Sequence, residues 1–294
     1  MSKKVVLGTH LRGGRPRSSL KQEFEFLRNV AERAGLADWH ILILEQPRNK
    51  HSCEERQKDK ATWKNAASEL GSSLTLVYDF EYVLDEPTTL AWNKLHRNAF
   101  ECLQADVFVY TDPNPATPRW DPCYRKAIEP RLKELVVQAQ SMDYVTGDYT
   151  PVAPRNSKDS LLSQRNVRFK ITIEEGVKQM LNDRFSSLLV GWSLFDDLTR
   201  PRSEFHALSR RLYDNLKKLS PIPYDYGLQM LLVARIKGLN VCCQDLGEVP
   251  VTASDRYSPR TMMGQLRRVD FQLAQIQEWL AGLQSCRVSK GSLD

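Results

Sequence analysis

Residues 85–118 read DEPTTLAWNKLHRNAFECLQADVFVYTDPNPATP, and this stretch holds the clearest pattern in the chain. Its first half carries leucine and alanine at near-helical spacing, which predicts a helix from about Thr88. The run Val107–Tyr110 is short and apolar, as in a strand buried within a parallel sheet. Asp112 follows it, ahead of Pro113. Because ligands of open α/β sheets bind at the carboxyl ends of the strands, this order predicts a ligand site at Asp112.

The segments before this stretch repeat the alternation of strand and helix. Apolar runs at 4–8, 39–44 and 74–78 predict strands, and an amphipathic pattern predicts a helix over 19–34. Residues 46–60 are polar and are interpreted as a loop that runs into a further helix. This β-α-β order predicts an α/β fold with a mostly parallel sheet and helices on both faces.

The pattern beyond Asp112 is more mixed. A polar loop over 151–166 is a candidate substrate lid, and residues 167–173 alternate as a strand does, with a helix start as the alternative. The remaining expected elements are helices at 124–139, 174–184, 203–218, 226–238 and 259–284, and strands at 143–149 and 239–244. We interpret the chain as one continuous body with a nucleotide-binding half, 1–112, and an acceptor-binding half, 113–294.

Composition fits a globular protein with anionic ligands. The chain has 294 residues, of which 41% are hydrophobic and 27% charged, which suits one large domain or two close-packed ones. No apolar run approaches the roughly 20 residues that span a bilayer, and the N-terminus shows no signal-peptide pattern. The net charge of +6 suits anionic substrates and also permits contact with nucleic acid.

Cysteine and histidine usage argues against a disulfide framework and against zinc. The six cysteines are scattered without a CxxC motif, which predicts reduced, mostly buried thiols in a cytoplasmic protein. The five histidines form no HxxxH or HExxH pair, so a structural zinc site is not expected. The sequence leaves the oligomeric state open, a homodimer included.

Polar residues near the ends of the expected strands are candidates for binding an anionic ligand. The loop His10–Arg17, HLRGGRPR, follows the first strand, and its glycines permit close approach to a diphosphate; a solvated basic loop is the alternative. Glu45 ends the second strand, and Lys94 adds a cation on the helix before Asp112. Asp112 with Asn114 offers oxygen ligands for Mn²⁺ or Mg²⁺, although an aspartate before a proline also starts turns.

The second half carries a resemblance to a known family. The segment PYDYGLQMLLVARIKGLNVCCQDLGEV, residues 223–249, and SPRTMMGQL, residues 258–266, resemble the glucosyl-3-phosphoglycerate synthases and their mannosyl relatives. The resemblance covers most of residues 74–284. It implies a GT-A fold with a helical C-terminal acceptor part, a nucleotide-diphosphate sugar as donor, a divalent cation, and transfer to a hydroxyl with retention of configuration.

The same resemblance suggests roles for individual residues. LHRNA, with Arg97 and Asn98, resembles a helix turn common in GT-A enzymes; an exposed helix face is the alternative. Together with the candidates near the strand ends, these two residues complete the expected donor-binding set: Thr9, Arg12, Gly13, Gly14, Arg15, Glu45, Lys94, Arg97, Asn98, Tyr110 and Thr111. Asp225 stands in Asp-Tyr-Gly where mannosylglycerate synthase has Asp-Trp-Gly. Asp112 and Asp225 are therefore the candidate catalytic residues, although an acid at a helix N-terminus is also favoured by the helix dipole.

Residues 169–177, FKITIEEGV, resemble the acceptor-binding Arg-Val-Thr-Glu segment of the family. Lys170 takes the place of its arginine and Thr172 of its threonine. Arg165 and Arg168 lie close by in sequence, and the four residues form a candidate clamp for an acidic acceptor. A charged strand edge is the alternative interpretation of all four.

The chain departs from the family at three positions. Only the second acid of the DxD motif is present in Tyr110-Thr111-Asp112, Gln229 replaces a glutamate, and Val251 stands near the position of a metal-binding histidine. We predict a cytoplasmic glycosyltransferase that acts on glycerate or phosphoglycerate, or on a hydroxymethylated DNA base as phage-type enzymes do. The alternative is a degenerate GT-A protein that binds nucleotide or a partner without catalysis.

Overall fold

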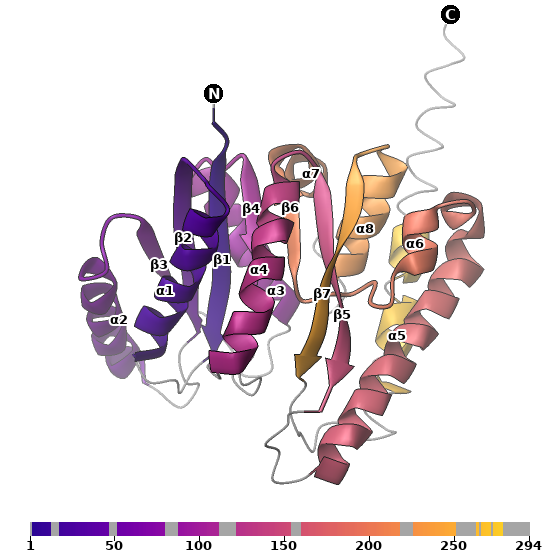
Figure 1. Cartoon of the computed structure of the whole chain (residues 1–294), viewed down its shortest axis with the longest axis horizontal. Helices are drawn as coiled ribbons and strands as arrows, with labels where there is room; N and C mark the ends of the chain where they lie inside the picture. Colours follow the sequence, from indigo (N-terminus) through magenta and orange to yellow (C-terminus); the bar gives the residue numbers. More distant parts are fainter. Residues whose placement is uncertain are drawn as a thin grey trace, which may run out of the picture.

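The computed structural model describes residues 2–12, 18–46, 52–79, 88–111, 122–153, 160–217 and 226–250, and residues 263–278 except Gln265 and Gln272. A seven-stranded sheet with the order β3-β2-β1-β4-β6-β5-β7 runs through this part of the chain (Figure 1). Among the described helices, none combines the length and the apolar character that a membrane crossing requires. The sheet continues from the predicted nucleotide half into the acceptor half, because β4 pairs with β6.

The N-terminal four strands are parallel, as the apolar runs predict. They are β1 (Lys4–Arg12), β2 (Asp38–Gln46), β3 (Leu74–Tyr78) and β4 (Val107–Tyr110). Gly8 pairs with both Leu42 and Tyr110 in the centre of the sheet. A Cβ atom at Gly8 would lie 2.4 Å from the ring of Phe108, so only glycine fits this position.

Four helical segments lie between these strands, and a fifth follows β4. They are α1 (Ser18–Arg33), α2 (Cys53–Ser68), α3 (Thr88–Arg97), the π-helix η1 (Asn98–Cys102) and α4 (Pro122–Ala139). The predicted loop over 46–60 is wrong from Cys53 onward. Ser52 and Glu55 form a capping box, in which each side chain accepts from the other's backbone N–H. Because of this cap, α2 begins several residues before the apolar residues that indicate a helix in the sequence.

The C-terminal strands are β5 (Tyr144–Val152), β6 (His206–Ser209) and β7 (Val241–Pro250). β6 runs antiparallel to both β4 and β5, whereas β5 and β7 are parallel. The predicted helix over 203–218 is wrong at its start. Ser209 ends β6 and caps α7 (Arg210–Leu216), because its side chain accepts from the N–H of Leu212.

The longest helix among the described residues, α5 (Ser160–Leu189), replaces the predicted loop end at 160–166. The strand predicted at 167–173 is wrong, and the alternative of a helix there is confirmed. Its first half has an inward face that is largely polar, formed by Ser163, Asn166, Lys170 and Glu174. This half of α5 therefore lacks the apolar stripe, repeating every 3.6 residues, by which a helix is predicted from sequence. α6 (Ser193–Asp197) and α8 (Tyr226–Ile236) complete the described helices of this half, with the helical residues of 263–278.

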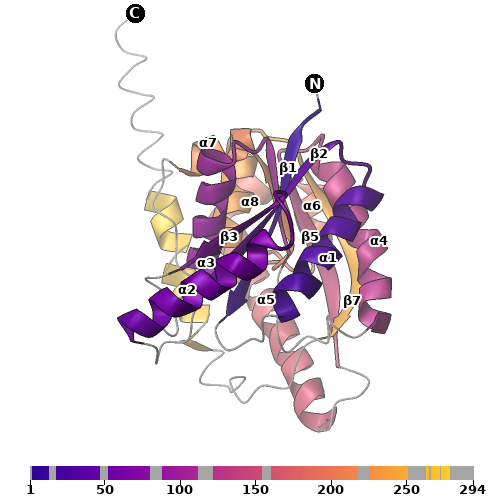
Figure 2. The same cartoon turned by 90° about the vertical axis from the view of Figure 1, so that its left-hand side faces the viewer.

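The helices cover both faces of the sheet (Figure 2). α1, α2 and α4 pack on one face against residues such as Leu7 and Ile43, while α3, α5, α7 and α8 pack on the other against residues such as Val6 and Leu44. Successive residues of one strand thus pack into the two opposite hydrophobic layers, because side chains alternate between the two faces of a sheet.

The four cysteines whose side chains are described are free thiols, but the predicted burial is wrong for them. Cys53 and Cys102 are exposed, and Cys242 and Cys243 are half-buried. Cys102 ends the π-helix, whose buried residues are Ala99 and Phe100.

Candidate functional site

The parallel strands end at one edge of the sheet, at the bottom of Figure 1. Buried polar side chains gather at or just beyond these ends: Thr9, His10, Glu45, Gln46, Asp79 and Thr111. They come from four different strands, and each follows a run of apolar residues. We call this set the strand-end site.

The end of β4 is fixed against β1 by three contacts. The Oγ1 of Thr9 donates to the carbonyl oxygen of Thr111 at 2.7 Å, and the N–H of Thr111 donates to the carbonyl oxygen of Gly8 at 3.0 Å. The Nδ1 of His10 and the hydroxyl of Tyr110 lie 2.7 Å apart. Asp112 thus follows a firmly held residue. The Oγ1 of Thr111 is buried and has no partner among the described residues.

A buried acid organises the ends of β2 and β3. The Oδ2 of Asp79 accepts from the Nζ of Lys94 at 2.7 Å and from the Nε2 of Gln46 at 3.3 Å. The N–H of Asp79 donates to the carbonyl oxygen of Glu45 at 2.8 Å, which ties the two strand ends together. The predicted residues Thr9, Glu45, Lys94, Tyr110 and Thr111 are therefore brought to one edge.

The structure places Arg97 and Asn98 elsewhere. Arg97 lies about one helical turn beyond Lys94 on α3, and Asn98 begins the π-helix that follows. The Nε of Arg97 donates to Glu101 at 3.1 Å, and the Nδ2 of Asn98 donates to the carbonyl oxygen of Lys94 at 2.8 Å. The geometry does not bring these two residues to the strand-end site.

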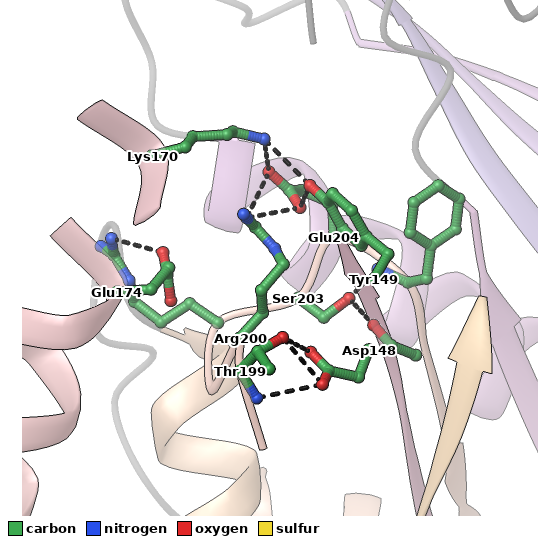
Figure 3. A network of polar contacts seen from close by, with 11 residues as sticks. Asp148, Tyr149, Lys170, Glu174, Thr199, Arg200, Ser203 and Glu204 are labelled. Carbon is green, nitrogen blue, oxygen red and sulfur yellow. Dashed lines mark hydrogen bonds and ion pairs between the residues drawn. The ribbon is translucent and has the colours of Figure 1, made fainter. Parts of the chain in front are cut away.

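A second set of polar residues lies where β5, α5 and the segment before β6 meet (Figure 3). We call it the Arg200 cluster; its members are Tyr149, Lys170, Glu174, Arg200, Arg202 and Glu204. Glu204 is its centre. It accepts from the hydroxyl of Tyr149 at 2.6 Å, from the Nζ of Lys170 at 2.9 Å and from the Nη2 of Arg200 at 3.2 Å.

The other contacts of the cluster extend it along α5. The Nη2 of Arg202 donates to the Oε1 of Glu174 at 2.9 Å, and the Nζ of Lys170 also donates to the hydroxyl of Tyr149 at 2.9 Å. The guanidinium of Arg200 stacks on the ring of Tyr149, 4.2 Å from its centroid. Three elements distant in sequence are thus joined by charge-assisted hydrogen bonds.

The electrostatics of the cluster follow from its burial. Burial alone would raise the pKa of Glu204, but the charges of Lys170 and Arg200 hold that pKa well below its usual range. Burial lowers the pKa of Lys170 in spite of the opposing charge of Glu204, and burial raises the pKa of Tyr149 well above its ordinary value. The acid is therefore ionised and the phenol protonated at neutral pH.

The predicted acceptor residues do not converge. Lys170 points inward to Glu204, whereas Arg165, Arg168 and Thr172 are exposed on the other side of α5. The sequence analysis selects Lys170 but not Tyr149, Glu174, Arg200, Arg202 or Glu204, and the predicted helix over 203–218 gives Glu204 no place in a site. The only sequence signal for them is the pair of opposite charges four residues apart in RPRSE, which is not specific.

Several predicted residues lie outside the described part of the chain. They are Gly13, Gly14, Arg15, Asp112, Asn114 and Asp225; Arg12 ends β1. Within the described residues no group of three or more histidine, cysteine, aspartate or glutamate residues could hold a metal ion. Gly227 lies in the first turn of α8, two residues after Asp225 in sequence. A Cβ atom there would lie 3.7 Å from Trp92 and 3.8 Å from the Cα of Arg202, which puts this helix start beside the Arg200 cluster.

Comparison with known proteins identifies the fold. No family model matches the chain, and no curated protein sequence does. Glucosyl-3-phosphoglycerate synthase from Mycobacterium tuberculosis, solved with phosphoglyceric acid, is similar with a TM-score of 0.50 at 14% identity, over 93% of this chain and 79% of that one. Mannosyl-3-phosphoglycerate synthase from Rubrobacter xylanophilus gives 0.49 at 15% identity, over 94% and 75%. The predicted GT-A fold is confirmed, and at this identity the likeness speaks for the fold alone.

Proposed function

We propose that this protein is a glycosyltransferase that takes its sugar from a nucleoside-diphosphate sugar. The observation that carries the proposal is the strand-end site, where buried polar groups of four strands of a GT-A sheet converge directly ahead of Asp112. This edge is where open α/β sheets bind their ligands. A nucleotide offers many hydrogen-bonding groups to polar side chains at such an edge.

The residues of the strand-end site suit different parts of the donor. Glu45 and Asp79 are carboxylates that can accept hydrogen bonds from ribose hydroxyls or a base N–H. Lys94 has 32% of its side chain exposed, so its ammonium group can face a diphosphate while Asp79 holds it. The buried Oγ1 of Thr111 can bond the donor close to Asp112.

A divalent cation fits the oxygen donors that follow β4. Asp112 would hold it with its carboxylate and Asn114 with its amide oxygen, and both are the hard ligands that Mg²⁺ and Mn²⁺ prefer. When bound, the cation would neutralise charge on the departing diphosphate. The remaining work falls to the chain's own residues, which orient the donor and place Lys94 near the same charge.

The reaction that we propose replaces one bond of the anomeric carbon by another. The bond from that carbon to the diphosphate oxygen breaks, a bond to the acceptor's hydroxyl oxygen forms, and the hydroxyl proton passes to the departing diphosphate. The family resemblance of residues 223–249 supports retention of configuration. Such chemistry depends on positioning and charge stabilisation more than on a strong protein base.

We propose a small hydroxy acid, such as glycerate or phosphoglycerate, as the acceptor. The Arg200 cluster supports this, because it holds three cationic side chains beside the start of α8. A structure with the same fold was solved with phosphoglyceric acid. The competing acceptor, a hydroxymethylated base in DNA, is favoured by the exposed arginines Arg165 and Arg168 on α5.

Nucleotide binding tests the proposal directly. Thermal unfolding is measured with UDP, GDP, CDP, ADP and TDP, each with and without Mn²⁺ or Mg²⁺, and one nucleotide should raise Tm by mass action. The matching nucleotide sugars are then assayed for transfer. If no nucleotide shifts Tm, the transferase proposal is wrong; binding without transfer or hydrolysis would instead support the degenerate GT-A protein.

The double variant R165A/R168A separates the two acceptors. With a small acid as acceptor, its kcat and KM should match those of the wild type, because both side chains point away from the cluster. With duplex DNA as acceptor, binding should weaken, and the slope of log affinity against log salt should fall by about two. Fluorescence anisotropy over a salt series measures the second outcome.

A further inference from the structure

Arg200 is a buried cation with hydrogen-bonding capacity left over. Its side chain is 3% exposed, and its Nη2 donates to Glu204. Its Nε and Nη1 are buried, and neither has a partner within the described part of the chain. Buried N–H groups are nearly always paired in folded proteins, and those of a charged group are the costliest to leave unpaired.

Arg200 shares its acid with Lys170. Glu204 accepts from both of these cations, and Glu174 accepts from Arg202. Asp148 lies in the same network, but its carboxylate accepts from the N–H of Thr199 at 3.0 Å and from its Oγ1 at 2.8 Å. Asp148 therefore makes no hydrogen bond with the unpaired nitrogen atoms of Arg200.

The segment that carries Arg200 is firmly held next to the strand-end site. The hydroxyl of Ser203 donates to the carbonyl oxygen of Gly147, and the N–H of Gly147 donates to the carbonyl oxygen of Phe205 at 2.8 Å. His206 follows at once and pairs with Tyr110, two residues before Asp112. Arg200 is thus anchored close to the place where the donor sugar is expected.

A second unpaired group of opposite kind belongs to the same cluster. The Oε2 of Glu174 is buried and has no donor among the described residues, while its Oε1 accepts from Arg202. Glu174 is also near enough to contribute to the raised pKa of Arg200. A molecule with both an anionic oxygen and a hydroxyl would satisfy the two unpaired groups together.

We infer that Arg200 is the residue that binds the anionic group of the acceptor, a carboxylate or a phosphate, and that Glu174 accepts a hydroxyl of the same small molecule. Lys170 then has a different task, since Glu204 and Tyr149 already engage its ammonium group. It holds α5 against β5 and leaves the ligand to Arg200. This inference rests on the proposed function and gives its acceptor a defined anchor.

Calorimetric titration of the full chain with inorganic phosphate and, separately, with glycerate tests the inference without nucleotide. The wild type should bind at least one of them, and the choice distinguishes phosphate from carboxylate recognition. R200K keeps the charge and the pairing with Glu204 but loses the additional N–H donors, so its affinity should fall by about tenfold or more. K170M should lower Tm and leave the affinity for the anion within about twofold.

Two controls separate binding from folding. R235K changes another guanidinium that stacks on a ring, 5.0 Å from the centroid of Trp192, and should bind the anion as the wild type does. R200Q removes the charge and leaves Glu204 paired with Lys170 and Tyr149, so it should lose the affinity for the anion while its Tm stays near that of R200K. A loss of affinity that only follows the loss of Tm across the variants would mean that Arg200 acts only on the fold.

The inference is overturned if the wild type binds neither anion, if R200K binds as tightly as the wild type, or if K170M loses the affinity instead. Nucleotide-induced shifts in Tm are recorded for the same variants. R200K should show the same nucleotide-induced shift in Tm as the wild type. If neither the wild type nor any variant binds nucleotide, the transferase proposal is wrong, whereas the anion site is judged only by the titrations with phosphate and glycerate.

Discussion

Lys94 and Lys170 present the same chemistry in two different settings. Each ammonium group donates to a carboxylate, Lys94 to Asp79 at 2.7 Å and Lys170 to Glu204 at 2.9 Å. Lys94 keeps 32% of its side chain exposed, at an edge where parallel strands end. Lys170 keeps 15%, and the hydroxyl of Tyr149 and the charge of Arg200 enclose the same acid.

The difference shows what makes a cation available to a ligand. From the sequence both lysines are candidate ligand-binding residues, but the residues around them in the structure give them different roles. At the strand-end site the acid orients a cation that still faces outward. In the Arg200 cluster the lysine completes an internal network, and the neighbouring Arg200 keeps two unpaired nitrogen atoms among the described residues. The following predictions separate the two regions by stability and by activity.

Glu204→Ala is expected to have the largest effect, and it should act on stability. Removing the acid leaves Lys170 and Arg200 buried without a counter-charge, which costs about 3 kcal/mol in other buried pairs. Urea unfolding measures the loss. Asp214→Ala is the control, because Asp214 pairs with the exposed Lys217 and should change stability by less than about 1 kcal/mol. Equal effects of the two variants would show that the cluster is not a structural centre.

Asp112→Asn should act on the other region and on activity alone. If Asp112 holds the cation and the diphosphate, the variant should lower kcat at least about a hundredfold, the scale of losing one electrostatic contact in a transition state. Its Tm without nucleotide should equal that of the wild type. Transfer within a few-fold of wild type would place the charge stabilisation elsewhere in the strand-end site.

A pair of buried histidines at the junction of the regions predicts a loss of stability in acid. The Nε2 atoms of His96 and His206 lie 3.2 Å apart, so one ring donates to the other and both are neutral. Burial lowers the pKa of His206 to about 3, and burial with the neighbouring His206 lowers that of His96 well below its usual value.

The sign follows from these lowered pKa values. The unfolded chain takes up protons near its ordinary histidine pKa of about 6.5, whereas the folded chain does not. Stability should therefore be constant above about pH 6.5 and fall as the pH drops toward 3, by about 2 kcal/mol per histidine between pH 7 and pH 5. Urea unfolding across this range measures it for the wild type and for H96Q/H206Q, which should keep only the smaller dependence that His40 and Glu204 contribute. An equal slope in both proteins would assign the effect to other groups.

The sequence predicts the strand-end site better than the Arg200 cluster, for a physical reason. The strands 4–8, 39–44, 74–78 and 107–110 are apolar runs, and their polar end residues meet because parallel strands share an edge. Asp79, His10 and Gln46 follow from the same rule once the strands are known. Asp112, Asn114 and Asp225 lie outside the described residues, so their roles stay predictions.

The Arg200 cluster resists prediction because it joins residues 149, 170, 174 and 200–204 through the tertiary fold. The cluster also makes α5 hard to predict from the sequence. The inward face of α5 is polar where it meets the cluster, so the segment lacks the apolar stripe by which amphipathic helices are found. β6 is four residues long and leads directly into α7, which made the pair resemble one helix. In both places tertiary contacts override the local pattern.

The smallest expected effect compares two residues of one helix. Lys94→Met removes the cation that we place near the diphosphate, and nucleotide affinity should weaken about tenfold, as for one charge-assisted contact. Arg97→Ala should leave affinity unchanged, because its guanidinium pairs with Glu101 away from the strand-end site. Calorimetric titration with the nucleotide that gives the largest shift in Tm measures both. The Lys94 variant still leaves Gln46 to bond Asp79, so its fold should persist. If Arg97→Ala weakened binding and Lys94→Met did not, the donor would lie beyond Lys94 toward the C-terminal end of α3, and the geometric argument for the strand-end site would fail.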